Sequence, residues 1–184
     1  MENQFLTIRA TKTVTSILCY IPETQSYHIH ELKFSSDESL PIVLQKIKET
    51  LIELIKEKEI QTIYIKDITP GSLGIDPERY MIHGVLIQSS YEAGVKNILF
   101  RKKSTIKSIY QNNKHFVELF GKEFKFDLDN YAKSATELKE FSSKIFPGIN
   151  IDNIKNNNTR ETYLTSLCGF LENMETISTK KKKN

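Results

Sequence analysis

The sequence predicts an α/β fold in which one mixed sheet is covered by helices on both faces. Three segments near the amino terminus are rich in β-branched and aromatic residues, and short polar connections separate them as in hairpins. An alternation of apolar-striped helices and short apolar strands follows, which implies parallel strands joined by right-handed crossovers. Such a mixed sheet needs cover on both faces.

The three predicted antiparallel strands cover residues 5–9, 13–21 and 27–34. Residues 10–12 and 22–26 connect them and are short and polar, which favours hairpins between consecutive strands.

A long helix is predicted over residues 40–58, after capping residue types at 35–38 and with Pro41 in its first turn. Its apolar residues recur at helical spacing and form one stripe: Leu44, Ile47, Leu51, Leu54 and Ile55. A short strand is predicted over 60–65, and it delivers Asp67 at its carboxyl end.

The next helix is predicted to begin at Asp76-Pro77-Glu78, which offers a cap, a first-turn proline and a first-turn acid. Gly94 is placed to end this helix, and residues 95–100 form the next apolar strand. Further helices are predicted near 115–120, 132–145 and 159–174, with a Pro-Gly stop after the second of them.

Composition bounds the function classes. The 184 residues are 39% hydrophobic, which suits one domain with a real core, and the net charge of +3 is too small to require a nucleic-acid partner by itself. Cys19 and Cys168 fall on apolar faces without metal-ligand spacing, as in a reducing compartment. Neither a signal peptide nor a membrane-spanning run is apparent, so we expect a soluble cytoplasmic protein without a membrane association.

The order of elements resembles the RNase H-like fold, and specific segments are similar to RuvC-type resolvases and their uncharacterised bacterial relatives. Ile65-Lys66-Asp67 resembles their second acidic motif, residues 97–107 resemble their fifth strand and the helix after it, and residues 161–168 resemble their carboxyl-terminal helix. The resemblance implies sheet order 3-2-1-4-5, formed by residues 1–110 and 159–176. Residues 111–158 would be a helical insertion and residues 177–184 a basic disordered tail.

The resemblance also implies two-metal phosphodiester cleavage, in which carboxylates from different elements converge on divalent cations. Asp67 matches the second acidic position and Glu161 matches the position near the start of the last helix. Both would be catalytic residues and ligands of Mg²⁺ if the protein is active; otherwise no cofactor is expected. Each also has a structural interpretation, Asp67 as a turn residue and Glu161 as an acid that complements its helix terminus.

The chain departs from this pattern on its first strand, where the family expects an acid. No Asp or Glu occurs between Glu2 and Glu23, and Arg9 stands on the predicted strand instead. A guanidinium stays protonated and has no acceptor, so Arg9 cannot hold Mg²⁺, although it can pair with a carboxylate or bind a phosphate.

A divergent RNase H-like protein with an incomplete acidic site is therefore the preferred hypothesis, acting as a nucleic-acid-binding or protein-interaction subunit. DNA or RNA phosphates would contact five basic residues: Arg9, Arg101, Lys102, Lys103 and Lys107. A protein partner would bind residues 111–158. The alternatives are a Mg²⁺-dependent nuclease that uses Asp67, Glu161 and a substitute acid such as Asp76 or Glu78, and a purely structural scaffold.

Overall fold

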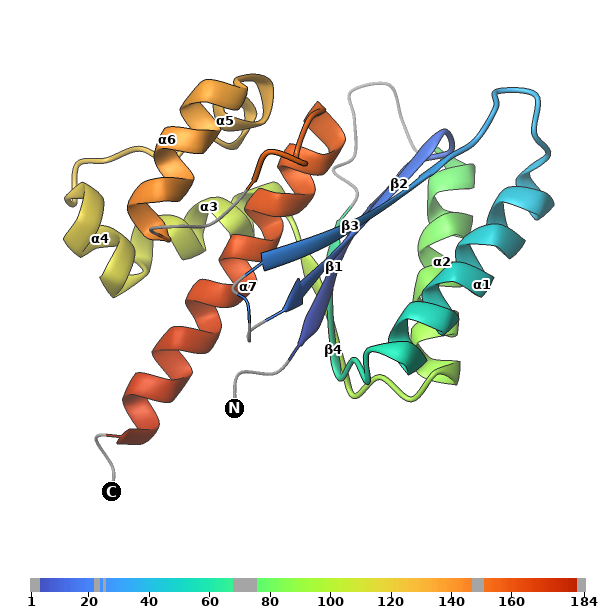
Figure 1. Ribbon diagram of the computed structural model, residues 1–184, viewed down its shortest axis with the longest axis horizontal. Coiled ribbons are helices and arrows are strands. Elements are labelled where there is room, and N and C mark those ends of the chain that lie inside the picture. Colours follow the sequence, from blue (N-terminus) through green and yellow to red (C-terminus); the bar gives the residue numbers. More distant parts are fainter. Residues whose placement is uncertain (1–3, 22–23, 25, 68–75, 147–150, 182–184) are drawn as a thin grey trace.

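A five-stranded sheet divides the molecule into two helical layers (Figure 1). The computed structural model describes residues 4–21, 24, 26–67, 76–146 and 151–181. The strand order is β3-β2-β1-β4-β5, which confirms the predicted order.

The amino-terminal half of the sheet is an antiparallel meander. Strand β1 (Phe5–Ala10) pairs with β2 (Val14–Ile21), and β2 pairs with β3 (Ser26–Lys33), as the polar connections predicted. The register places Arg9 of β1 opposite Ser16 of β2.

The parallel half consists of β4 (Thr62–Lys66), which pairs with β1, and β5 (Asn97–Arg101), which pairs with β4. The predicted strand at 60–65 therefore begins and ends later than expected. This difference matters because Lys66 belongs to the strand, so the pleat of the sheet fixes the direction of its side chain.

One face of the sheet is covered by α1 (Leu40–Glu57) and α2 (Pro77–Glu92), which are the helices at the right of Figure 1. The core on this side is aliphatic, because the α1 stripe meets the inward residues Leu6, Ile8 and Ile63. The side chain of Asp76 accepts a hydrogen bond from the backbone N–H of Glu78, so the predicted cap at the start of α2 is confirmed.

The opposite face is covered by α7 (Asn157–Lys181), which lies between the sheet and the remaining helices. The core on this side is rich in aromatic rings. On three neighbouring strands, the Phe5 ring contacts the Tyr20 ring in a tilted arrangement and the Tyr64 ring edge to face. Gly169 of α7 lies against Tyr64, because a Cβ atom at this position would stand 2.5 Å from the Tyr64 ring. The absence of a side chain therefore lets α7 approach the sheet closely.

Four helices cover the outer side of α7: α3 (Lys103–Asn112), α4 (Lys114–Phe120), α5 (Leu128–Lys133) and α6 (Ala135–Ile145). The single helix predicted over 132–145 is wrong, because Ser134 is extended and its hydroxyl caps α6 by accepting from the Glu137 N–H. The expected assignment of 111–158 as an insertion stays a prediction.

Arg160 ties this helical layer to α7. The residue is 8% exposed, and its guanidinium donates to the carbonyls of Ala132, at 2.5 Å, and Lys155, at 2.7 Å. A cation at the carboxyl end of α5 also complements the helix dipole.

Helix α7 runs further than the end predicted near Met174. It continues to Lys181, so the part of the expected disordered tail at 177–181 has helical backbone, while 182–184 and the Pro-Gly stop at 147–148 lie outside the described residues. Within the described residues, no helix combines the length and the apolarity that a membrane span requires.

Candidate functional site

A row of charged side chains crosses the sheet at the carboxyl end of its parallel strands. Arg9 follows the Ile8–Ile65 pair of β1 and β4, which places it beside Lys66, and Lys66 is in register with Arg101 of β5. Side chains alternate along a strand, so Arg9 and Lys66 share the α7 face with Phe5 and Tyr64. Three cations thus stand next to one another on three adjacent strands.

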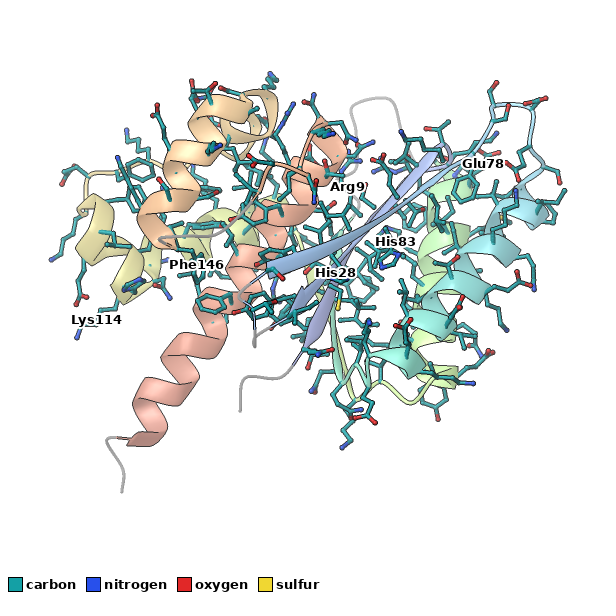
Figure 2. The ribbon with its side chains drawn as sticks, viewed as in Figure 1. Arg9, His28, Glu78, His83, Lys114 and Phe146 are labelled. Carbon is teal, nitrogen blue, oxygen red and sulfur yellow. The ribbon has the colours of Figure 1, made fainter. Side chains whose placement is uncertain are left out.

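Arg9 is held by the first turns of α7. Its Nε donates to Glu161 Oε2 at 2.7 Å, and another guanidinium nitrogen donates to the side-chain oxygen of Asn158. The side chains of Arg9 and Glu161 are 20% and 24% exposed, so the ion pair is mostly shielded from water. Figure 2 shows Arg9 near the start of α7.

Arg101 is also paired with an acid of α7. Its guanidinium contacts Glu172 at 2.5 Å and lies over the ring of Tyr64, 5.1 Å from the centroid. The ring and the carboxylate both order this side chain. In this structure Arg101 is therefore engaged by α7 and by Tyr64 and is not part of an open phosphate-binding surface.

Lys66 occupies the middle of the row and is 9% exposed. Burial is the main cause that lowers its pKa, the neighbouring charge of Glu161 opposes this shift, and Arg9 adds to it. Sequence analysis did not select Lys66 as a site residue. Alternation along β4 was the signal, but it required the register that places Lys66 in the strand.

Asp67 is the first residue after β4, and its backbone N–H donates to the carbonyl of Arg101. Because side chains alternate along the chain, Asp67 turns toward the other face of the sheet, which α2 covers. On that face, burial lowers the pKa of His83, and the charge of Asp67 opposes that shift. Asp67 and Glu161 still meet at one pocket, because the row lies at the edge of the sheet.

This pocket, which we name the edge pocket, has a volume of about 280 Å³. Nine residues from six elements line it: Arg9, Ala10, Lys66, Asp67, Arg79, Lys103, Leu128, Asp129 and Glu161. Four of them are cationic and three are anionic, which gives the lining a net formal charge of +1. Arg79 and Asp129 were missed in the sequence because they are far apart in the chain from each other and from the other lining residues.

The remaining lysines that were predicted to contact phosphate differ in their surroundings. Lys103 forms an exposed ion pair with Asp129, whereas Lys102 and Lys107 are exposed at the start of α3 and along it. The proposed substitute acids point elsewhere: Asp76 caps α2, and Glu78 pairs with Lys12 at 2.9 Å.

The edge pocket does not fit the pair of divalent cations that the RNase H-like resemblance implies. Mg²⁺ takes several oxygen ligands from converging carboxylates. In this pocket Glu161 is paired with Arg9, and Lys66, on the strand next to Arg9, carries an ammonium group. Among the described residues, no group of three or more His, Cys, Asp or Glu side chains is placed to hold a metal.

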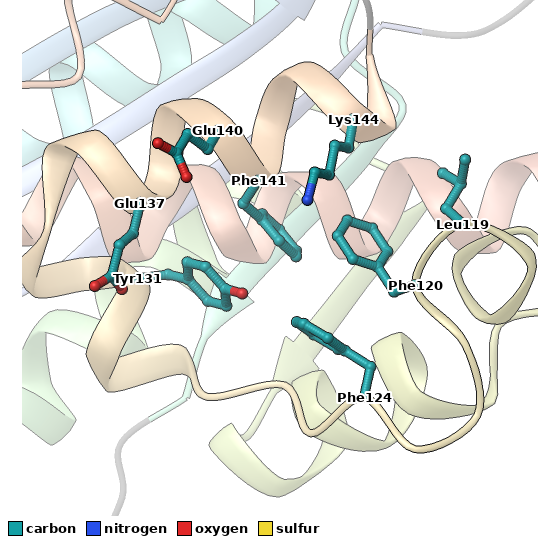
Figure 3. Close-up of a pocket in the computed structure, with 8 residues that line it drawn as sticks. All are labelled: Leu119, Phe120, Phe124, Tyr131, Glu137, Glu140, Phe141 and Lys144. Atoms are coloured by element: carbon teal, nitrogen blue, oxygen red, sulfur yellow. The ribbon is translucent and has the colours of Figure 1, made fainter.

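A second hollow lies among α4, α5 and α6, with a volume of about 340 Å³ (Figure 3). We name it the aromatic hollow, because the rings of Phe120, Phe124, Tyr131 and Phe141 line it. Lys144 lies over the Phe120 ring, 5.7 Å from its centroid. The edge pocket and the aromatic hollow therefore differ in chemistry: charged side chains dominate the first, whereas aromatic rings line the second beside three charged side chains, Glu137, Glu140 and Lys144.

The chain is similar to solved structures. No protein-family model matches the sequence, and no curated protein matches it. The RuvC structure of Thermus thermophilus has a TM-score of 0.66 at 10% identity, covering 94% of this chain and 96% of that chain. RuvC of T. thermophilus in complex with a Holliday junction substrate has a TM-score of 0.51 at 13% identity, covering 61% and 73%.

The yeast mitochondrial Holliday junction resolvase Ydc2 has a TM-score of 0.49 at 10% identity, covering 97% of this chain and 84% of that chain. The fold of the chain is therefore RNase H-like and RuvC-type, as the sequence resemblance predicted. A fold does not fix a function, so the residues at the edge pocket decide what this chain does with it.

Proposed function

We propose that this chain is a divergent RNase H-like protein that binds nucleic acid at the edge pocket and does not cleave it by two-metal catalysis. The Arg9–Glu161 ion pair carries the proposal, because it places a permanent positive charge beside an acid that a metal would need. A cation at this point repels Mg²⁺ and attracts phosphate.

The surroundings of the pocket support phosphate binding. Lys103 lines it, and Lys102 and Lys107 are exposed at the start of α3 and along it. This helix follows β5 at the end of the strands where a ligand would approach an open α/β sheet. The likeness to the T. thermophilus RuvC that is in complex with a Holliday junction substrate makes four-way DNA a reasonable probe.

The test combines cleavage and binding. Labelled single-stranded, duplex and four-way DNA, and single-stranded and duplex RNA, are incubated with Mg²⁺ or Mn²⁺ and the wild type, Asp67→Asn or Glu161→Gln protein. We expect no cleavage by any of them, and binding whose affinity falls as salt rises. Metal-dependent cleavage that disappears in both variants would replace this proposal with a nuclease. Failure to bind every probe at low salt would reject the nucleic-acid role.

A protein-interaction role of residues 111–158 is the second candidate, and the aromatic hollow favours it. Leu119 lines this hollow and is 43% exposed, so it extends the apolar surface that a partner could cover. Co-purification of a defined partner that Leu119→Asp abolishes, without loss of nucleic-acid binding, would establish this role. A stable protein with neither a partner nor nucleic-acid binding would leave the scaffold alternative.

A further inference from the structure

The strongest unexplained feature of the edge pocket is the lysine at its base. Lys66 is 9% exposed, and no hydrogen bond or ion pair involves its ammonium group within the described part of the chain. The side chain is mostly desolvated, and only its ammonium end reaches the solvent of the pocket. A charge held in such a place without a hydrogen-bond partner is costly for a folded protein, so its retention needs a reason.

The neighbours of Lys66 make the cost higher. Arg9 and Arg101 flank it on the two adjacent strands, and like charges opposite one another destabilise a sheet. Each arginine forms an ion pair with a carboxylate of α7: Arg9 pairs with Glu161, and Arg101 pairs with Glu172. The middle cation forms no such ion pair within the described residues: the charges of Glu161 and Asp67 are near enough to favour its protonated form, and its hydrogen-bonding capacity is left for the pocket.

A second cationic side chain in the pocket has spare hydrogen-bonding capacity. The Nε of Arg79, on α2, is buried and has no hydrogen-bond partner within the described residues. Lys66 and Arg79 approach the pocket from different elements, which suits a ligand with several acceptor oxygens better than a single carbonyl. The pocket volume of about 280 Å³ is ample for one tetrahedral anion.

We propose that the edge pocket is a phosphate subsite in which Lys66 is the direct ligand of one phosphate group of bound nucleic acid, with Arg79 as a second donor. This inference rests on the proposed nucleic-acid binding. It adds that one buried lysine, and not the exposed Lys102 or Lys107, makes the strongest phosphate contact. A desolvated charge pair is stronger than a solvated one, since water and salt screen it less.

The test compares Lys66→Met with Lys96→Met in the full chain. Lys96 is exposed just before β5, at the amino end of the parallel strands and so at the end opposite the edge pocket; it serves as a matched loss of charge. We expect Lys66→Met to weaken binding of a labelled DNA duplex about tenfold or more and to lower the slope of log affinity against log salt by about one. Lys96→Met should leave both near the wild-type values.

Thermal stability separates a ligand role from a structural one. If Lys66 serves the ligand, Lys66→Met removes a mostly desolvated charge that has no hydrogen bond or ion pair within the described residues, and it raises the melting temperature while binding is lost. Lys66→Arg keeps the charge and should retain more affinity than Lys66→Met. Binding by Lys66→Met with wild-type affinity and salt slope would overturn this inference and leave the proposed function intact.

Failure of the wild type to bind any nucleic acid would instead remove the proposed function and this inference together, so the two failures are distinguishable. Duplexes with hydroxyl ends and with 5′-phosphate ends identify the source of the phosphate. Sensitivity to Lys66→Met with hydroxyl ends assigns an internal phosphate, and sensitivity confined to phosphorylated ends assigns a terminal one.

Discussion

The two faces of the sheet are built from different chemistry although they share the same five strands. The face under α1 and α2 is packed with aliphatic side chains, mostly leucine, isoleucine and valine. The face under α7 is packed with aromatic rings and small polar residues, and its edge carries the cation row. One face is thus a plain core, while the other also builds the edge pocket.

The difference teaches that stability and the candidate function are separable in this fold. Substitutions in the aliphatic core should act on folding alone. Substitutions on the α7 face act on a helix that both packs against the sheet and supplies Glu161 and Glu172 to its cations. The four predictions below test this separation.

Leu51→Ala should have the largest effect on stability. Leu51 of α1 is completely buried in the aliphatic core, and truncation leaves a cavity that costs about 2–5 kcal/mol of the free energy of unfolding. Chemical denaturation measures this loss. The exposed Ile42 of the same helix provides the control, because Ile42→Ala should change stability by at most about 0.5 kcal/mol. Equal effects of the two substitutions would contradict the assigned core face.

Gly169→Ala should destabilise the α7 face by about 1–3 kcal/mol, because the new methyl group collides with the Tyr64 ring and forces α7 away from the sheet. Alanine is the better helix former, so this loss arises in spite of a gain in helix propensity. Gly84→Ala in α2 is the matched control: open space surrounds that position, and stability should rise by up to about 1 kcal/mol. Stabilisation by Gly169→Ala would show that the Tyr64 ring moves at little cost.

Arg9→Met should cost about 1–2 kcal/mol of stability, since it leaves the half-buried Glu161 without its charged partner. Adding Glu161→Gln should recover part of the loss, and a double-mutant cycle measures the coupling between the two residues. Zero coupling would mean that the ion pair at 2.7 Å contributes nothing to folding.

The pH dependence of stability should reveal Lys66. Burial lowers the pKa of Lys66 in the folded protein below its ordinary value of 10.5, so the unfolded chain binds more protons in the pH range between the two values. The free energy of unfolding contributed by this group should therefore rise as pH increases through the folded pKa toward 10.5. Denaturation curves of the wild type and Lys66→Met over this range measure the contribution as a difference. Parallel pH profiles would show that Lys66 titrates normally.

The sequence was enough to predict the sheet order and most of the elements, although not the break at Ser134 between α5 and α6. Alternation in the first strands, the apolar stripe of residues 40–58 and the Asp76-Pro77 start signal are local patterns, and local hydrogen bonding and burial settle them. The sequence also shows directly that the first strand carries no acid, because no Asp or Glu occurs between Glu2 and Glu23. The sequence also selected Arg9 and Glu161, although it did not pair them.

Tertiary structure decided which charges meet. Strand β4 ends one residue later than predicted, so Lys66 belongs to the strand. Because side chains alternate with a period of two, Lys66 lies in the row beside Arg9, and Asp67 turns toward α2. Pairing of Arg101 with Glu172 depends on the position of α7 against the sheet, which packing against Tyr64 and Gly169 sets. Such contacts join residues far apart in the chain, so no local pattern contains them, and the chemistry of the edge pocket follows from the packing of α7.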